Sequence, residues 1–87
     1  MPTTYQLVYR QSVKKQLKKL PKKDLKAIVS KVLKLAENPR PLGYTKLRGT
    51  DDLYRIRQGD YRVIYQIKDK KLIIIIIKIG HRKEAYR

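Results

Sequence analysis

The chain lacks several residue types, and each absence removes a class of protein. It contains no cysteine, so neither disulfide bonds nor thiolate metal sites can stabilise it, and its single histidine, His81, cannot build a histidine cluster. Tryptophan and phenylalanine are also missing, which disfavours an interfacial membrane anchor. The fold must therefore depend on packing of aliphatic and tyrosine side chains.

Acidic residues are scarce. There are 7 of them against 23 lysines and arginines among 87 residues, which gives a net charge of +16. Such a balance favours a polyanionic partner, either nucleic acid or an acidic protein. Asp51, Asp52, Asp60 and Asp69 are spread over expected turns, and no pair has a spacing that would hold Mg²⁺ against a phosphodiester. We therefore expect a site without a metal or another cofactor.

Long hydrophobic runs are absent as well. The longest, residues 72–77, is far too short to cross a bilayer, and residues 1–5 lack the basic and then apolar layout of a signal peptide. We expect a cytoplasmic protein without a membrane partner. The length suits one small domain over residues 1–87, with a single sheet packed on one or two helices.

Hydrophobic periodicity predicts the order of the elements. Residues 5–9 alternate as a strand, and Val13, Leu17 and Leu20 have helical spacing, with Ser12 as a possible cap. Pro21 separates this helix from a second one that stops by residues 38–39. Strands are then predicted at 45–47, 53–57, 61–67 and 72–79. We expect an α+β fold in which an N-terminal strand and a helical hairpin precede an antiparallel meander, all in a small twisted antiparallel sheet. The unbroken apolar run in the last strand predicts a central strand covered on both faces.

The predicted hairpin concentrates positive charge. If residues 59–60 form a two-residue turn, Arg57 lies opposite Arg62, and Arg55 shares their face. Like charges directly opposite each other are destabilising, so the arrangement makes sense if an anion such as phosphate sits between the guanidinium groups. With a three-residue loop, Arg57 would face Tyr61 instead and the argument would weaken. An ordinary solvated edge face is the alternative interpretation.

The C-terminal residues supply candidate proton carriers. Metal-free RNA cleavage needs a base for the ribose 2′-hydroxyl, an acid for the leaving 5′-oxygen and fixed cations for the phosphorane. Tyr86 and His81 are the candidates near the arginines, because arginine stays protonated. Each has a simpler interpretation, Tyr86 as a ring packed on the sheet and His81 as a surface histidine. Lys46 and Arg48 are likewise either RNA contacts or ordinary loop cations.

Several short motifs, in this order and spacing, resemble those of RelE-type toxins in the RelE/ParE toxin superfamily. The resemblance extends over the whole chain, and the motifs are KLRG at 46–49, LYRIR at 53–57, YRVIY at 61–65, GHR at 80–82 and Tyr86.

The resemblance implies the toxin of a type II toxin–antitoxin pair. Such a toxin enters the ribosomal decoding site and cuts mRNA there without a metal, by 2′-hydroxyl attack that leaves a 2′,3′-cyclic phosphate, and so inhibits translation. The implied partners are an acidic antitoxin, the ribosome with its mRNA, and operator DNA through the toxin–antitoxin complex.

Roles for individual residues follow from the same motifs. By resemblance, Arg62 would hold the scissile phosphate, Arg82 would stabilise the transition state and Tyr86 would take part in proton transfer. Family members often carry lysines where this chain has arginines at 55 and 57, so the acid and base roles shift toward Tyr86 and His81. Phosphate binding would fall to Arg55, Arg57, Lys46 and Arg48.

Two other functions remain open from the sequence. A toxin of the same fold that inhibits DNA gyrase would not need the arginine–tyrosine set. A non-catalytic basic RNA-binding domain would bind RNA with strong salt dependence but would not cut it.

Overall fold

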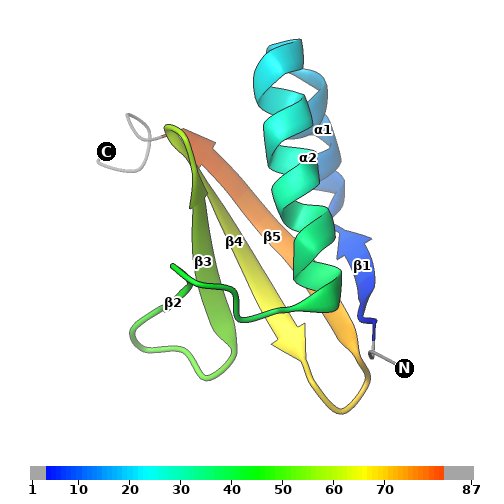
Figure 1. The fold of residues 1–87 in the computed structure, drawn as a ribbon, viewed down its shortest axis with the longest axis vertical. Coiled ribbons are helices and arrows are strands. Elements are labelled where there is room, and N and C mark those ends of the chain that lie inside the picture. The colour runs from blue at the N-terminus through cyan, green and yellow to red at the C-terminus, as the bar shows by residue number, and fades with distance from the viewer. Residues whose placement is uncertain (1–3, 82–87) are drawn as a thin grey trace.

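The computed structural model describes residues 4–81, and two predicted site residues, Arg82 and Tyr86, lie outside this range. Two helices and five strands follow the predicted order (Figure 1). The predicted α+β class is therefore confirmed. The elements are β1 (Gln6–Tyr9), α1 (Gln11–Lys18), α2 (Lys22–Glu37), β2 (Thr45–Lys46), β3 (Leu53–Gln58), β4 (Tyr61–Lys68) and β5 (Ile73–His81).

The five strands form one mixed sheet in the order β1-β5-β4-β3-β2. Strands β2 to β5 make the predicted antiparallel meander, whereas β1 pairs with β5 in parallel, from Gln6 opposite Ile73 to Tyr9 opposite Ile76. The expectation of an entirely antiparallel sheet is therefore wrong at one edge. Parallel neighbours need a long crossover connection, and here the helical hairpin and the meander together separate β1 from β5 in the chain.

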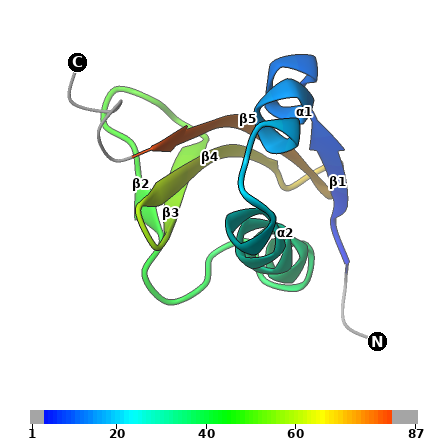
Figure 2. The same cartoon turned by 90° about the horizontal axis from the view of Figure 1, so that it is seen from above.

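The helices protect different parts of the sheet. Helix α2 lies over one face, and α1 lies near β1 and β5 (Figure 2). Strand β1 is much shorter than β5, and beyond its end α1 takes over the edge of β5, where the Ile79 N–H donates to Gln16 Oε1 at 3.1 Å. Helix α1 begins at Gln11 after Arg10, without a side-chain cap bond, so the predicted Ser12 cap is wrong.

The core lies between the helices and one side of the sheet. We call this side the helix face, and its buried side chains include Ile56, Val63 and Tyr65. Burying an aliphatic side chain of this kind contributes about 1.5–3 kcal/mol. The buried core residues are Val13, Ile28, Val32, Leu35, Tyr54, Ile56, Val63, Tyr65, Ile67, Ile74, Ile76 and Ile79.

Strand β5 contains an irregularity that decides which side chains enter this core. Ile64 pairs with Lys78 and Tyr65 pairs with Ile76, so Ile77 is an extra residue in β5. Because an inserted residue reverses the alternation beyond it, Ile79 is buried and Lys78 is exposed. An uninterrupted strand would instead have turned the lysine toward the core.

Strand β5 lies in the interior of the sheet, between β1 and β4, as predicted. Within the described part of the chain, however, only one of its two faces is covered. Ile74 and Ile76 are fully buried, whereas Ile73, Ile75 and Ile77 are only half-buried. The expectation of two covered faces is therefore wrong. Leu72, predicted to belong to the strand, lies instead in the turn before it with a positive φ of 56°.

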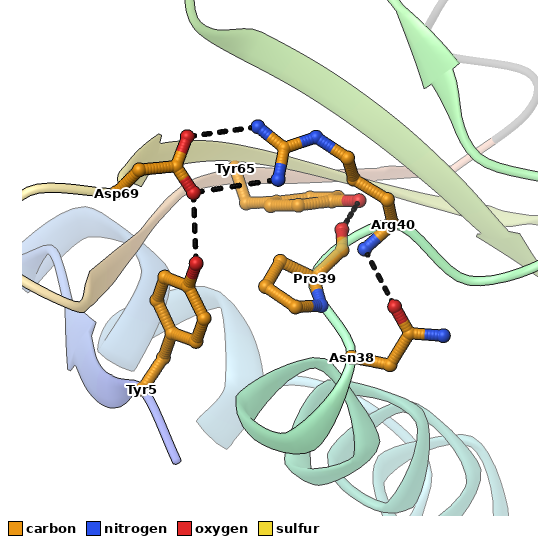
Figure 3. Close-up of polar contacts among 6 residues, drawn as sticks. All are labelled: Tyr5, Asn38, Pro39, Arg40, Tyr65 and Asp69. Atoms are coloured by element: carbon orange, nitrogen blue, oxygen red, sulfur yellow. Dashed lines mark hydrogen bonds and ion pairs between the residues drawn. The ribbon is translucent and has the colours of Figure 1, made fainter. Parts of the chain in front are cut away.

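Polar contacts fix the end of the sheet at the β4–β5 turn (Figure 3). The Arg40 guanidinium donates to both carboxylate oxygens of Asp69, at 3.3 and 2.9 Å, and the Tyr5 hydroxyl donates to Asp69 Oδ1 at 2.8 Å. These hydrogen bonds, Arg40 first, hold the pKa of Asp69 below its ordinary value. The buried Tyr65 hydroxyl donates to the Pro39 carbonyl oxygen at 2.7 Å. Together the contacts attach the loop after α2 to the sheet.

Candidate functional site

The hairpin of β3 and β4 has the two-residue turn, one of the two turn lengths that the sequence left open. Gln58 pairs with Tyr61 across it, so Gly59 and Asp60 are the turn residues. Gly59 has a φ of +59°, which hairpin turns of this length require and glycine adopts without strain. This register places Arg57 opposite Arg62.

Three arginines share one face of this hairpin, as predicted. Arg57 pairs directly with Arg62, and Arg55 lies two residues before Arg57 on β3. Because Ile56 and Val63 point into the core, strand alternation turns all three arginines to the other side of the sheet, which we call the arginine face. Arg57 is exposed, while Arg55 and Arg62 are half-buried.

The surroundings of the arginine face reinforce its charge. Strands β3, β4 and β5 contain no acidic residue, and β5 adds the exposed Lys78 opposite Ile64. Guanidinium groups suit phosphate because they donate paired hydrogen bonds in a fixed plane. The face therefore has the charge and donors needed to bind a phosphodiester.

Two other predicted RNA contacts lie away from these arginines. Lys46 pairs with Tyr54, whose side chain is buried on the helix face, so Lys46 belongs to that face and not to the arginine face. Arg48 lies in the turn between β2 and β3, toward the end of β3 that is remote from Arg57. Both are exposed, but the structure does not bring them together with the three arginines.

His81 also lies on the helix face. It pairs with Tyr61 at the end of β5, and the two rings stand nearly perpendicular, at 88°, with their centroids 5.0 Å apart. The irregularity at Ile77 determines this orientation, because it sets the alternation of every later residue of β5. His81 and Arg62 are thus close along the sheet but on opposite faces.

Tyr61 is a site candidate that the sequence did not identify. Besides its contact with His81, its hydroxyl donates to Asp24 Oδ2 of α2 at 3.3 Å, which ties the end of the hairpin to the helix. The only signal in the sequence was its position directly after the turn, beside Arg62.

The described residues contain neither a metal site nor a membrane helix. No group of three or more histidine, cysteine, aspartate or glutamate side chains within residues 4–81 is arranged to hold a metal ion. Neither α1 nor α2 is long and apolar enough to cross a membrane. The candidate site in this part of the chain consists of the three arginines on the arginine face.

A small basic protein with this fold and a cationic hairpin at one end of its sheet has the features of the small basic toxins. Residues 7–86 match the family described as the ParE toxin of the type II toxin–antitoxin system parDE. Because the match spans nearly the whole chain, the chain belongs to this toxin family.

Individual relatives carry the RelE name. Toxin RelE of Mycobacterium tuberculosis is 34% identical over 84 residues, which cover 95% of this chain and 87% of the relative. The mRNA interferase toxin RelE of Escherichia coli K12 is 31% identical over 83 residues, covering 93% and 86%. The archaeal RelE in the RelE–RelB complex of Pyrococcus horikoshii has a TM-score of 0.82 and 38% identity, covering 91% of this chain and 96% of that one. The predicted RelE-type toxin of the RelE/ParE superfamily is confirmed.

Proposed function

We propose that this toxin is an endoribonuclease that cleaves mRNA in the ribosomal decoding site without a metal. The observation that carries the proposal is the register that sets Arg57 directly opposite Arg62, with Arg55 on the same face. Like charges so arranged are destabilising unless an anion lies between them. A phosphodiester of RNA is such an anion, and a relative 31% identical is named an mRNA interferase.

The proposed reaction divides into charge stabilisation and proton transfer. The 2′-oxygen forms a bond to phosphorus as its proton passes to a base, and the bond from phosphorus to the 5′-oxygen breaks as an acid protonates that oxygen. The products are a 2′,3′-cyclic phosphate and a 5′-hydroxyl. Arg62 and Arg57 stabilise the charge that develops on the phosphorane oxygens, with Arg82 assigned the same role from its motif.

Tyr86 is assigned one of the two proton transfers. Arginine stays protonated and cannot act as the base, and His81 belongs to the helix face, across the sheet from Arg62. That orientation favours Tyr86 over His81, so the catalytic assignment of His81 is the weaker of the two made from the sequence.

The proposal includes an acidic antitoxin as the neutralising partner. A net charge of +16 favours an acidic polypeptide, and the similar Pyrococcus horikoshii protein was solved in complex with RelB. Through that partner the complex would also reach operator DNA. The ribosome supplies the mRNA, which sets the reaction in the cytoplasm.

The test is a cleavage assay on ribosomes programmed with a defined mRNA, beside the same mRNA without ribosomes. Primer extension should map new ends at one position in the decoding site, and end-group analysis should find cyclic phosphate and 5′-hydroxyl termini. A metal-activated water would leave different termini. Arg62→Ala should abolish cleavage without loss of the circular dichroism spectrum, because Arg62 lies on the arginine face and not in the core.

Two other results would replace the proposal. Intact mRNA together with inhibited supercoiling would identify a gyrase inhibitor of the same fold. RNA that is bound with strong salt dependence but never cut would identify a passive binding domain. The matched control for Arg62→Ala is Lys34→Gln, which removes one charge from the exposed last turn of α2.

A further inference from the structure

A pocket of about 410 Å³ lies at the end of the sheet nearest the β3–β4 turn. It belongs to the helix face, between the α1–α2 connection and the paired ends of β4 and β5. This volume lies within the range of pockets that bind small ligands. Its lining consists of Gln16, Lys19, Leu20, Pro21, Tyr61, Ile79 and His81.

The lining combines two rings with donors. Tyr61 and His81 are cross-strand partners in edge-to-face contact, and the Tyr61 hydroxyl is held by Asp24. Gln16 accepts the Ile79 N–H through its Oε1, which leaves its amide nitrogen as the donor of that side chain. Lys19 adds an exposed ammonium group. Such a site suits a flat aromatic ligand with acceptor atoms on its edge.

The pocket and the arginine face meet at the same end of the sheet. Tyr61 and Arg62 are consecutive in β4, so their side chains point to opposite faces, and His81, paired with Tyr61, lies on the same face as Tyr61. The two sites are therefore separated by the thickness of the sheet at its end. An RNA strand that passes around this end could place a phosphate on one face and a base on the other.

We propose that this pocket binds a nucleobase of the RNA whose phosphate lies on the arginine face. The proposal rests on the proposed function and specifies where its substrate is held. Nucleobases stack on aromatic side chains, and their edges carry carbonyl and ring-nitrogen acceptors that amide and ammonium donors satisfy. It assigns His81, the single histidine, to substrate binding and not to proton transfer.

An acidic peptide is the other occupant to consider. Its carboxylates would meet Lys19, but they would make no use of the ring faces of Tyr61 and His81. A base uses both the rings and the donors, and it is covalently joined to the phosphate that the neighbouring arginines attract. The observations therefore favour the base.

The first experiment observes binding without cleavage. Because the chain has one histidine, its imidazole protons give a single set of NMR signals. The purified toxin is titrated with a 2′-deoxy trinucleotide, which cannot undergo 2′-hydroxyl attack, and with three versions that each lack one base. The intact trinucleotide should shift the His81 and Tyr61 ring signals, and one of the three base-free versions should fail to do so.

This design separates the two proposals. Ring shifts from the trinucleotide would support the base pocket even if no mRNA were ever cut. Equal shifts from all the base-free versions, or none from the intact trinucleotide, would overturn it whatever the cleavage assay gave. Shifts produced by an acidic antitoxin peptide but not by the trinucleotide would assign the pocket to a protein partner and overturn it too.

The second experiment uses kinetics to distinguish binding from proton transfer. His81→Ala should raise KM for ribosome-bound mRNA by about 5- to 150-fold, the range expected for loss of one stacked base contact. The pH dependence of kcat should keep its shape. Lys19→Gln, an exposed change with little risk to folding, should also raise KM, with Lys34→Gln as its matched control. A variant of His81 that lost one limb of the pH profile at unchanged KM would make His81 a proton carrier and refute the assignment.

Discussion

Replacing Arg57 by glutamine should make the folded protein more stable while it lowers activity. Arg57 lies directly opposite Arg62 in an antiparallel pair, where opposite charges stabilise by roughly 0.2–1 kcal/mol and like charges destabilise, which we take to be of similar size. Arg57 is exposed, so solvent screens the repulsion, and we expect a gain in the lower part of that range, about 0.3 kcal/mol. Glutamine removes the charge and leaves a shorter, neutral polar side chain at this exposed position.

Salt is the variable that isolates this effect. The screening length is about 30 Å at 0.01 M salt and about 3 Å at 1 M. The gain from Arg57→Gln should therefore be largest at low ionic strength and vanish at high ionic strength. Unfolding in urea, which is uncharged, can be followed by circular dichroism at both salt concentrations, and Lys34→Gln controls for the general relief of a +16 chain.

The same variant should bind RNA phosphates less tightly and cleave more slowly, since it removes one of the cations facing the phosphate. Stability and function would then change in opposite directions, as expected where charge is gathered for a ligand. The reasoning is refuted if Arg57→Gln is less stable than the wild type at low salt. It also fails if any gain persists at 1 M salt or is matched by Lys34→Gln.

Three further predictions concern single groups. Tyr65→Phe deletes the hydroxyl that donates to the buried Pro39 carbonyl, so urea unfolding should show a loss of about 1–3 kcal/mol; an unchanged midpoint would mean that water replaces the bond. The pKa of Asp69 is lowered by Arg40, so its contribution exists above the ordinary carboxyl range near pH 4 and is lost as pH falls. Asp69→Asn should therefore be less stable than the wild type at pH 7, by less than about 1 kcal/mol for an exposed pair, and the difference should shrink as the pH falls below the ordinary carboxyl range. Tyr86→Phe should slow cleavage of ribosome-bound mRNA, and full activity would show that only the ring matters.

The elements that carry strong local signals were predictable from the sequence. Residues 53–67 alternate between cationic or polar and apolar side chains around Gly59, so both strands followed from the sequence. The shared face of the arginines followed only for a two-residue turn, and the sequence left the turn length open. Proline and hydrophobic spacing likewise separated the helices at Pro21. In these segments the local preference and the tertiary packing agree.

The faces of β5 could not be predicted in the same way. Five successive isoleucines carry no alternation, so nothing in residues 73–77 reveals an inserted residue. Only Lys78, which would otherwise point into the core, gives a signal of the irregularity at Ile77. The extra residue Ile77 determines that His81 lies beside Tyr61 and not on the face of the arginines. Because the sequence does not reveal this insertion, it placed His81 near the arginines, among the candidate proton carriers.

Contacts between residues far apart in the chain could not be predicted from the sequence either. Arg40 and Asp69 lie in different loops, 29 residues apart, and nothing local to either loop indicates that they meet. The parallel pairing of β1 with β5 and the position of Lys46 on the helix face likewise depend on which strands become neighbours. Periodicity predicts elements, but it does not by itself assign their partners.

The arginines at the two ends of the sheet have different neighbours, and this difference is relevant to function. At the β4–β5 turn, Arg40 forms an ion pair with Asp69. At the β3–β4 turn, Arg57 faces Arg62, held there by the buried Ile56 and Val63 beside them. The core therefore keeps the cations together despite their repulsion. A site fixed on rigid strands in this way is already arranged for its anion before that anion binds, which reduces the ordering that binding requires.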